Sequence, residues 1–235
     1  MPNENPPWRP LYAAGAAMAL VFIVMCVVPI ALVFSAPQPP STGGAAVLDY
    51  IASHKAVYWT EYLCFVGLCI PALVVFLALP LLLRDASGPL AAAGALFGIV
   101  SETLGLAANG SPPSLHGGLI HLSAQYAAAV TDAQRRALST AAEGFIATAN
   151  AVNAIGILTA LAILLLSIAM LKGIYGKPAA VIGIVTGGLG MVFEALRDQI
   201  GMLYAVYGCL LPLWFGMAGW GLLRASRGGG NPAVR

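Results

Sequence analysis

The sequence predicts an all-α fold, a polytopic bundle of transmembrane helices, and three observations lead to this fold class. Hydrophobic residues make up 60% of the 235 residues, and the mean hydropathy is +0.87. Charged residues make up only 9%, whereas a water-soluble domain uses about 25% to cover its surface. The apolar residues are gathered into stretches of about 20, the length at which a helix crosses the hydrocarbon core. Most of the outer surface is therefore expected to face the lipid bilayer.

Six stretches are long and apolar enough to be spans. They are residues 11–35, 56–83, 89–109, 144–171, 179–198 and 201–223. The first is longer than the apolar part of a signal peptide, about 7–15 residues, so we interpret it as a retained anchor. Segment 114–130 is short and only partly apolar. We expect it at the interface or partway into the membrane, with a seventh span as the alternative.

The spans make up a single transmembrane domain, 11–224, between a cytoplasmic N-terminus, 1–10, and a flexible cytoplasmic tail, 225–235. Lys and Arg predict this orientation, because they are enriched in cytoplasmic connections. The predicted cytoplasmic side carries Arg9, Arg84, Lys172, Lys177, Arg224, Arg227 and Arg235, and the outer side carries Lys55, Arg135, Arg136 and Arg197. Seven against four places both termini in the cytoplasm. The net charge of only +2, without a basic cluster, gives no indication of nucleic acid binding.

Two long connections, 36–55 and 110–143, are predicted on the outer side. The first starts with a Pro- and Gly-rich stretch that is typical of turns. It leads into 45–59, whose amphipathic spacing predicts a helix on the outer surface. Near the end of the second connection, Thr131 or Asp132 is expected to cap the fourth helix, which would begin in water and continue into the membrane.

A proline and two small residues recur at the start of the first, third and fifth spans. The prolines are Pro10, Pro89 and Pro178; Gly15, Gly94 and Gly183 follow five residues later, and Ala19, Gly98 and Gly187 four residues after that. Proline suits the first turn of a helix, and small residues four apart let neighbouring helices approach closely. The recurrence favours three parallel helical hairpins, a duplication of the kind that some transporters contain. The alternative is coincidence in a chain rich in alanine and glycine.

Glu102 is the strongest candidate for a functional residue, because an ionisable group inside a span costs about 2.5–3.5 kcal/mol at the helix centre. At 1.5 Å per residue it lies about 20 Å from Pro89, in the outer half of the membrane. No basic residue is near it in the sequence, so we expect its carboxyl group to be at least partly protonated. The alternative is a structural carboxyl that is hydrogen-bonded to a neighbouring helix.

Glu194, Arg197 and Asp198 form a second group of candidates. Their spacing of three and four residues places them on one face of a helix, in the last turn of the fifth span. Gly201 then permits a tight outer turn into the sixth span. We favour an interfacial ion pair that ends the helix. If Arg197 faces the bundle instead, it could bind a carboxylate or phosphate ligand.

Further polar residues are weaker candidates for a ligand-binding or proton-binding role. Glu61 lies beside Trp59 at the outer end of the second span, where an aromatic belt is expected. Glu143, Asn150 and Asn153 lie along one stripe of the fourth helix, which we expect to face other helices. Asparagines in such positions typically form interhelical hydrogen bonds.

His116 and His121 are also candidate ligand contacts, but we predict no metal site. They are five residues apart, about 140° around a helix, so a regular helix would not aim both at one ion. The cysteines have no CxxC spacing, so we interpret them as packing residues. They are Cys26, Cys64, Cys69 and Cys209. No motif identifies a cofactor.

Together these features resemble one family. The chain has six predicted spans, a long outer segment after the first, a His-containing outer segment, "KPAAVIGIVTGGLG" opening the fifth span and "EALRDQIG" turning into the sixth. This pattern is similar to bacterial multi-pass membrane proteins classified only as a domain-of-unknown-function family. The resemblance covers about residues 10–225. It implies a helical protein of the bacterial inner membrane and no catalytic residues.

Three functions are compatible with the sequence. The first is a binding or transport-type protein whose outer-half pocket, lined by Glu102, Glu194, Arg197 and the amides of the fourth helix, takes a small apolar or amphipathic ligand, a lipid headgroup or a proton. The second is an intramembrane enzyme with Glu102 as general acid on an isoprenoid or lipid. The third is an accessory subunit, in a homo-oligomer or a larger membrane complex. We favour the first, because the polar groups gather on one side of an otherwise apolar bundle.

Overall fold

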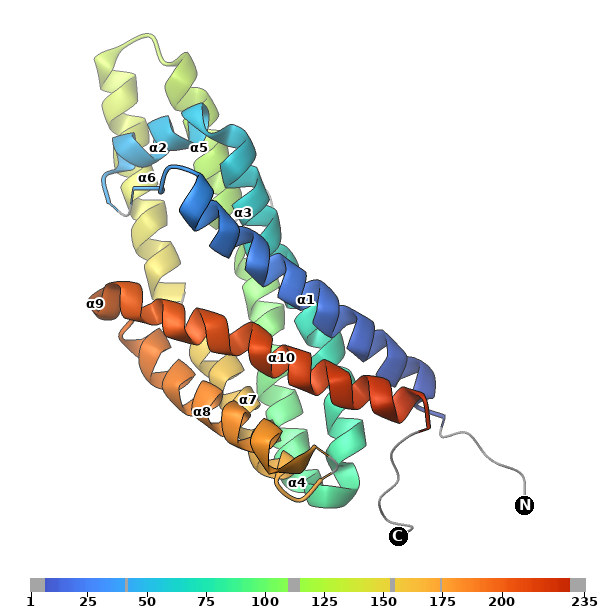
Figure 1. Cartoon of the computed structure of the whole chain (residues 1–235). Helices are drawn as coiled ribbons and strands as arrows, with labels where there is room; N and C mark the ends of the chain where they lie inside the picture. Colours follow the sequence, from blue (N-terminus) through green and yellow to red (C-terminus); the bar gives the residue numbers. More distant parts are fainter. Residues whose placement is uncertain (1–6, 41, 110–114, 153–154, 174, 229–235) are drawn as a thin grey trace, which may run out of the picture. The chain divides into compact units, whose positions relative to one another are not determined.

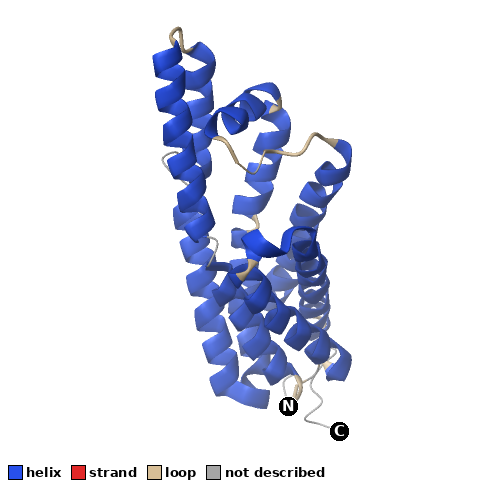
Figure 2. Ribbon diagram, turned by 90° about the vertical axis from the view of Figure 1, so that its left-hand side faces the viewer, coloured by secondary structure: helices blue, strands red, loops and turns tan. Residues whose placement is uncertain are grey.

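The protein is described by a computed structural model that covers residues 7–40, 42–109, 115–152, 155–173 and 175–228. Every regular element in these ranges is a helix, so the predicted all-α fold class is confirmed for them (Figure 1; Figure 2). The chain forms two compact units. Unit 1 comprises 1–26, 68–103 and 155–235, and unit 2 comprises 27–67 and 104–154.

Four helical stretches in the described residues are long and apolar enough to cross a membrane. They are Arg9–Leu32, Lys55–Ala108, Gly176–Ala195 and Gly201–Ser226. The second has 54 residues, about 80 Å of helix, which is more than twice the thickness of the hydrocarbon core. The chain therefore has the helices of a membrane protein. Its six-span topology stays a prediction.

A break at Ser87 divides the longest of these stretches. It comprises α3 (Lys55–Gly67) and α4 (Cys69–Asn109), and Ser87 has non-helical angles of φ −164° and ψ 73° inside α4. The chain reverses direction there (Figure 1). The sequence predicts one span ending at 83 and the next beginning at 89, which fits this break. Pro89 lies directly after it, where a missing backbone N–H costs the helix least.

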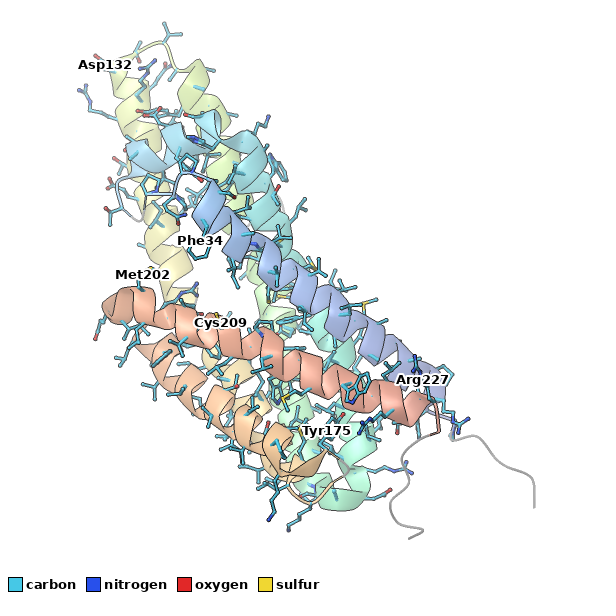
Figure 3. The ribbon with its side chains drawn as sticks, in the orientation of Figure 1. Phe34, Asp132, Tyr175, Met202, Cys209 and Arg227 are labelled. Atoms are coloured by element: carbon cyan, nitrogen blue, oxygen red, sulfur yellow. The ribbon has the colours of Figure 1, made fainter. Side chains whose placement is uncertain are left out.

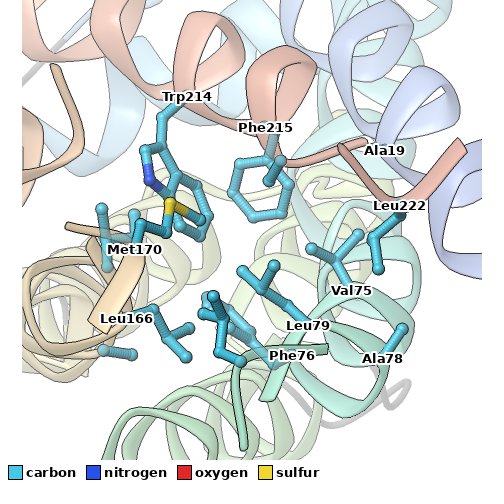
Figure 4. Packing of buried hydrophobic residues seen from close by; sticks show 14 of the residues in the cluster. Ala19, Val75, Phe76, Ala78, Leu79, Leu166, Met170, Trp214, Phe215 and Leu222 are labelled. Atoms are coloured by element: carbon cyan, nitrogen blue, oxygen red, sulfur yellow. The ribbon is translucent and has the colours of Figure 1, made fainter. Parts of the chain in front are cut away.

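Aromatic residues fill the centre of unit 1, which is built from the first part of α1 (Arg9–Ser35), α4, α7 (Gly156–Met170), α8 (Gly176–Ala195) and α10 (Tyr204–Ser226). The rings of Phe22 and Phe215 are stacked with 3.6 Å between their centroids, and Phe76 meets Phe215 edge to face at 5.9 Å. Trp214 packs beside Phe76 and Phe215 (Figure 4). Its Nε1 donates a hydrogen bond of 2.9 Å to Ser167 Oγ. The buried indole N–H is thus satisfied.

The recurring small residues all lie buried between helices of unit 1. This holds for Gly15, Ala19, Gly94, Gly98, Gly183 and Gly187. A Cβ atom at Gly15 would lie 2.8 Å from Ala78, and one at Gly94 would lie 2.7 Å from Leu166. The predicted role of these positions in close helix packing is therefore confirmed. The duplication of three hairpins stays a prediction, because close packing alone does not require it.

The start of α1 and the end of α10 lie together at one end of unit 1. A Cβ at Gly228, after α10, would lie 2.5 Å from Arg9 at the start of α1. Tyr12 is close enough to Arg84, beside the break in α4, to feel its charge. Tyr175, in the turn before α8, donates a hydrogen bond to the carbonyl of Ala218 in α10 (Figure 3). Several of the basic residues predicted to face the cytoplasm thus share one end of this unit.

Unit 2 packs three helices around its own core. They are α2 (Gly44–Ser53), α5 (Leu115–Ala128) and α6 (Asp132–Val152). The buried face of α2 includes Leu48 and Ile51, which confirms the predicted amphipathic helix, although His54 interrupts it before α3. Ser123 of α5 donates a 2.7 Å hydrogen bond to the carbonyl of Leu48. At 14 residues, about 21 Å, α5 is too short to cross the hydrocarbon core.

The start of α6 has the cap that the sequence predicts, with Thr131 as the capping residue. Its Oγ1 accepts a hydrogen bond of 3.3 Å from the backbone N–H of Gln134. In return Gln134 Oε1 accepts from the backbone N–H of Thr131 at 3.3 Å. This reciprocal pair is a capping box, which satisfies backbone donors that the helix itself leaves unpaired. The first turns of α6 are exposed, as expected for a helix that begins in water.

Candidate functional site

Glu102 lies in the second half of α4 and faces α7 in the interior of unit 1. Its residue is only 5% exposed, and the neighbouring Ser101 is 3% exposed. Oε1 of Glu102 lies 2.9 Å from Thr159 Oγ1, in the first turn of α7. Ser101 Oγ lies 2.7 Å from the same Thr159 hydroxyl and 2.9 Å from the carbonyl oxygen of Ile155. The two helices are therefore joined by a short chain of polar groups.

The number of hydrogens in this chain indicates the state of Glu102. The carbonyl of Ile155 can only accept, so Ser101 must donate to it. Either hydroxyl can donate in the contact between Thr159 and Ser101, and in the contact with Glu102 the Thr159 hydroxyl is the donor to Oε1. If Ser101 donates to Ile155, Thr159 has a single hydrogen for these two contacts. Both are full hydrogen bonds only when the Glu102 carboxyl is protonated and donates to Thr159.

The thiol of Cys69, at the start of α4, also lies close to the Glu102 carboxyl group. Among the described residues, Glu102 takes part in no ion pair. Arg197, which was predicted to line the same pocket and could have neutralised Glu102, forms an ion pair with Glu194 instead. A carboxyl group with a purely structural role could form the same hydrogen bond to a neighbouring helix.

Glu194 lies in the last turn of α8, and its side chain is only 7% exposed. Its Oε1 accepts a hydrogen bond of 2.7 Å from the hydroxyl of Tyr204. Its Oε2 is buried and has no hydrogen-bond partner. Arg197 Nη1 lies 3.8 Å from Oε2, so the predicted ion pair is present. This distance is too long for a hydrogen bond.

The fifth helix ends earlier than the sequence predicts. α8 stops at Ala195, because Leu196 has angles of φ −108° and ψ 14°, and Arg197 begins the separate turn α9 (Arg197–Ile200). Gly201 has φ 51° and starts η2 (Gly201–Leu203), so the tight turn expected at this glycine is confirmed. Because Arg197 is carried by a turn of its own, its direction is set independently of α8.

The two buried carboxyl groups approach the same turn of α7. A Cβ atom at Gly156 would lie 2.5 Å from the carboxyl carbon of Glu194, and Thr159, three residues on, meets Glu102. Glu102 and Glu194, which are far apart in the sequence, are thus neighbours through this turn. Gly156 is the residue type that leaves room for the second carboxyl.

Two other carboxylate candidates, Glu61 and Glu143, belong to unit 2. Glu61 is partly buried in α3, next to an edge-to-face pair of Trp59 and Tyr62 at 5.5 Å, an environment that fits an aromatic belt. Glu143 is exposed, and its Oε1 accepts a 3.4 Å hydrogen bond from the backbone N–H of Gly44 at the start of α2. Glu143 therefore caps a helix of its own unit, which is a structural role.

His121 lies exposed on α5, and a ring nitrogen forms a 3.0 Å hydrogen bond with the side-chain amide of Gln125. The remaining predicted site residues are His116, Asn150 and Asp198, and their side chains lie outside the described part of the structure, as does Asn153. Within the described residues, no three His, Cys, Asp or Glu side chains gather as metal ligands.

An apolar groove of about 350 Å³ lies between α1 and α10. Its lining includes Ala16, Leu20, Gly219 and Trp220. None of the predicted site residues lines it, so this groove is not the polar pocket that the sequence predicts. Its apolar walls match the lipid-facing surface expected of such helices.

The sequence did not single out Thr159, Cys69 or Tyr204 as neighbours of the two carboxyl groups. One signal was present for Thr159, a lone hydroxyl in the first half of an apolar helix. Comparison with protein-family models, with curated proteins and with solved structures gives no match for this chain.

Proposed function

We propose that this protein is a membrane protein of the binding or transport type in which Glu102 takes up and releases a proton. The observation that carries this proposal is a buried carboxyl group that, among the described residues, is hydrogen-bonded to the hydroxyl of Thr159 and takes part in no ion pair. An ionisable residue inside a membrane helix is costly, and such residues typically serve ion or proton pathways. The count of hydrogens around Thr159 supports a proton resident on Glu102.

The chain of hydroxyls suits both states of this carboxyl group. With Glu102 protonated, hydrogens point from Glu102 to Thr159, then to Ser101, then to the Ile155 carbonyl. With Glu102 ionised, the Thr159 hydroxyl turns to donate to the carboxylate, and only its contact with Ser101 is lost. A single hydroxyl rotation therefore accommodates the loss of the proton without movement of the backbone.

The proposal includes a location in the bacterial inner membrane with both termini on the cytoplasmic side. Four long apolar helices support the membrane. The excess of Lys and Arg on the predicted cytoplasmic side supports the orientation. The neighbourhood of Arg9, Arg84 and the end of α10 at one end of unit 1 is consistent with it.

The proposal is tested by substituting Glu102→Gln, with Glu143→Gln as the matched control at an exposed carboxylate. Infrared difference spectra of the purified protein over a pH titration should show the C=O band of a protonated carboxyl group, and this band should be absent in E102Q. In liposomes with a trapped pH-sensitive dye, E102Q should reduce proton movement by about tenfold or more. E143Q should change neither measurement.

A structural role predicts a different pattern. E102Q would then lower the free energy of unfolding but leave proton movement unchanged in the protein that remains folded. The variant Thr159→Val separates the two roles further, because it removes the hydroxyl rotor and keeps the carboxyl group. If T159V moves protons like the wild type, the hydroxyl chain has no part in the pathway.

A further inference from the structure

The cluster at the end of α8 has a feature that proton binding at Glu102 does not use. Glu194 is nearly fully buried, yet one of its two carboxyl oxygens has no hydrogen-bond partner. Leaving a buried polar atom unsatisfied costs about 1–3 kcal/mol, and more for a charged group. Buried polar groups are almost always satisfied, so this oxygen requires an explanation.

Arg197 forms only a long ion pair with this oxygen. Its Nη1 lies 3.8 Å from Glu194 Oε2, whereas a guanidinium bound to a carboxylate normally approaches to about 2.7–2.9 Å, often through two nitrogens. The side chain of Arg197 is also 38% exposed. The pair therefore lacks the close, desolvated contact that makes an ion pair strong, and water or another cation can compete with it.

Tyr204 supplies the second element of the site. The guanidinium carbon of Arg197 lies 4.6 Å from the centre of the Tyr204 ring, within the range of a cation–π interaction. The hydroxyl of the same ring holds Glu194 Oε1 at 2.7 Å, which fixes the carboxyl group beside the aromatic face. A carboxylate and an aromatic face side by side are the elements that recognise an organic cation.

Arg197 lies on a short backbone connection, so its side chain can move away from Glu194 and Tyr204. It lies on the four-residue turn α9, between the end of α8 at Leu196 and Gly201 with its positive φ. Glu194 and Tyr204 belong to the longer helices α8 and α10. The carboxylate and the ring are therefore held by packed helices, while the cation between them is held by a short connection.

We propose that Glu194 and Tyr204 form a binding site for an organic cation, a lipophilic ammonium that carries at least one N–H donor, and that Arg197 occupies this site until the ligand displaces it. This proposal specifies the class of ligand for the transport-type function proposed above, and it therefore rests on that function. Arg197 acts as an internal competitor, so its removal exposes both recognition elements at once.

The test is equilibrium binding of radiolabelled 2-phenylethylammonium, an aromatic cation with N–H donors, to the full-length protein in maltoside micelles. Arg197→Ala should bind the probe about tenfold more tightly than the wild type, because the competing cation is gone. Arg197→Lys keeps a cation and should bind like the wild type. Glu194→Gln keeps the shape of the side chain and should weaken binding by about tenfold or more.

Two further variants exclude trivial explanations. Tyr204→Leu should weaken binding by several fold, whereas Tyr204→Phe keeps the aromatic face and should retain most of it. Glu143→Gln, an exposed carboxylate in unit 2, should leave binding unchanged. If Arg197→Ala binds the probe no more tightly than the wild type, or if Glu194→Gln binds it equally well, the proposal is overturned.

The same cation chemistry is present in an ethanolamine headgroup. Competition with lysophosphatidylethanolamine, matched against lysophosphatidylglycerol, distinguishes the two sources. Selective displacement by the ethanolamine lipid identifies a headgroup site, and equal effects identify a free cation; both outcomes support the cation site. The infrared band of Glu102 does not depend on the probe, so loss of cation binding with an intact Glu102 band refutes this inference alone.

Discussion

The contact between α7 and α8 gives the sharpest prediction about the stability of the fold. A Cβ atom at Gly187 would lie 2.6 Å from the backbone nitrogen of Leu164 and 2.7 Å from the carbonyl oxygen of Ala160, whereas ordinary contacts measure 3.4–4 Å. These obstacles are backbone atoms, which cannot rotate aside as a flexible side chain does. In Gly187→Ala, α7 and α8 must therefore separate by several tenths of an ångström.

The next residue provides a matched control. Gly188 lies on the same helix, and a Cβ there would have nothing within 4 Å. Both substitutions to alanine raise the helix propensity by the same amount, about 1 kcal/mol. The difference between Gly187→Ala and Gly188→Ala therefore isolates the cost of the clash, which we expect to be about 1–3 kcal/mol in favour of Gly188→Ala.

The assay is equilibrium unfolding in mixed micelles with increasing dodecyl sulfate, followed by tryptophan fluorescence, with helix content monitored by circular dichroism. Trp214 is fully buried near α8 and should report separation of these helices. If the two variants unfold with free energies that agree within about 0.5 kcal/mol, close approach at Gly187 does not limit stability, and the argument from its contacts is wrong.

Three further substitutions should each lower stability for a different reason. Tyr175→Phe removes the 3.0 Å hydrogen bond to the carbonyl of Ala218 and should cost about 0.5–1.5 kcal/mol in unfolding experiments. Burial raises the pKa of Tyr175, so its contribution is complete below about pH 10 and is lost as the pH rises further; the difference between wild type and Tyr175→Phe should shrink there. Thr131→Ala removes the cap of α6 and should cost about 1 kcal/mol in thermal unfolding followed by circular dichroism, and an unchanged midpoint would contradict this. Gly44→Ala should cost about 1–3 kcal/mol in the same assay, because its Cβ would collide with the backbone carbonyl of Ser139, unless α2 can move away from α6 freely.

The helix boundaries were predictable where the signals are local. The break at Ser87 falls between the two predicted spans, since Pro89 and the polar turn before it mark it in the sequence. Thr131 was one of two predicted caps, and its reciprocal bonds with Gln134 involve residues only three apart. The end of α8 was placed too late, because no proline or glycine directly follows Ala195 and span length alone favoured a longer helix.

The candidate site was predictable only in part. A glutamate in an apolar span is conspicuous, so Glu102 could be selected from composition and hydropathy. Its partners could not be selected, because Thr159 is 57 residues away in the sequence. Contacts between helices depend on how each helix is rotated about its own axis, and an apolar helix with little amphipathic character leaves that rotation undetermined.

The sequence by itself therefore determined an all-α chain with long apolar helices, where turns occur and which residues are too polar for their surroundings. These properties follow from chain length, hydropathy and the backbone preferences of proline, glycine and capping residues, which act over a few residues. Only the tertiary structure decided that Glu102 faces hydroxyls and a thiol, and that Arg197 pairs loosely with Glu194 beside Tyr204. The physical reason is that these pairings join different helices, whose approach is set by small residues and by packing along the whole length of the contact.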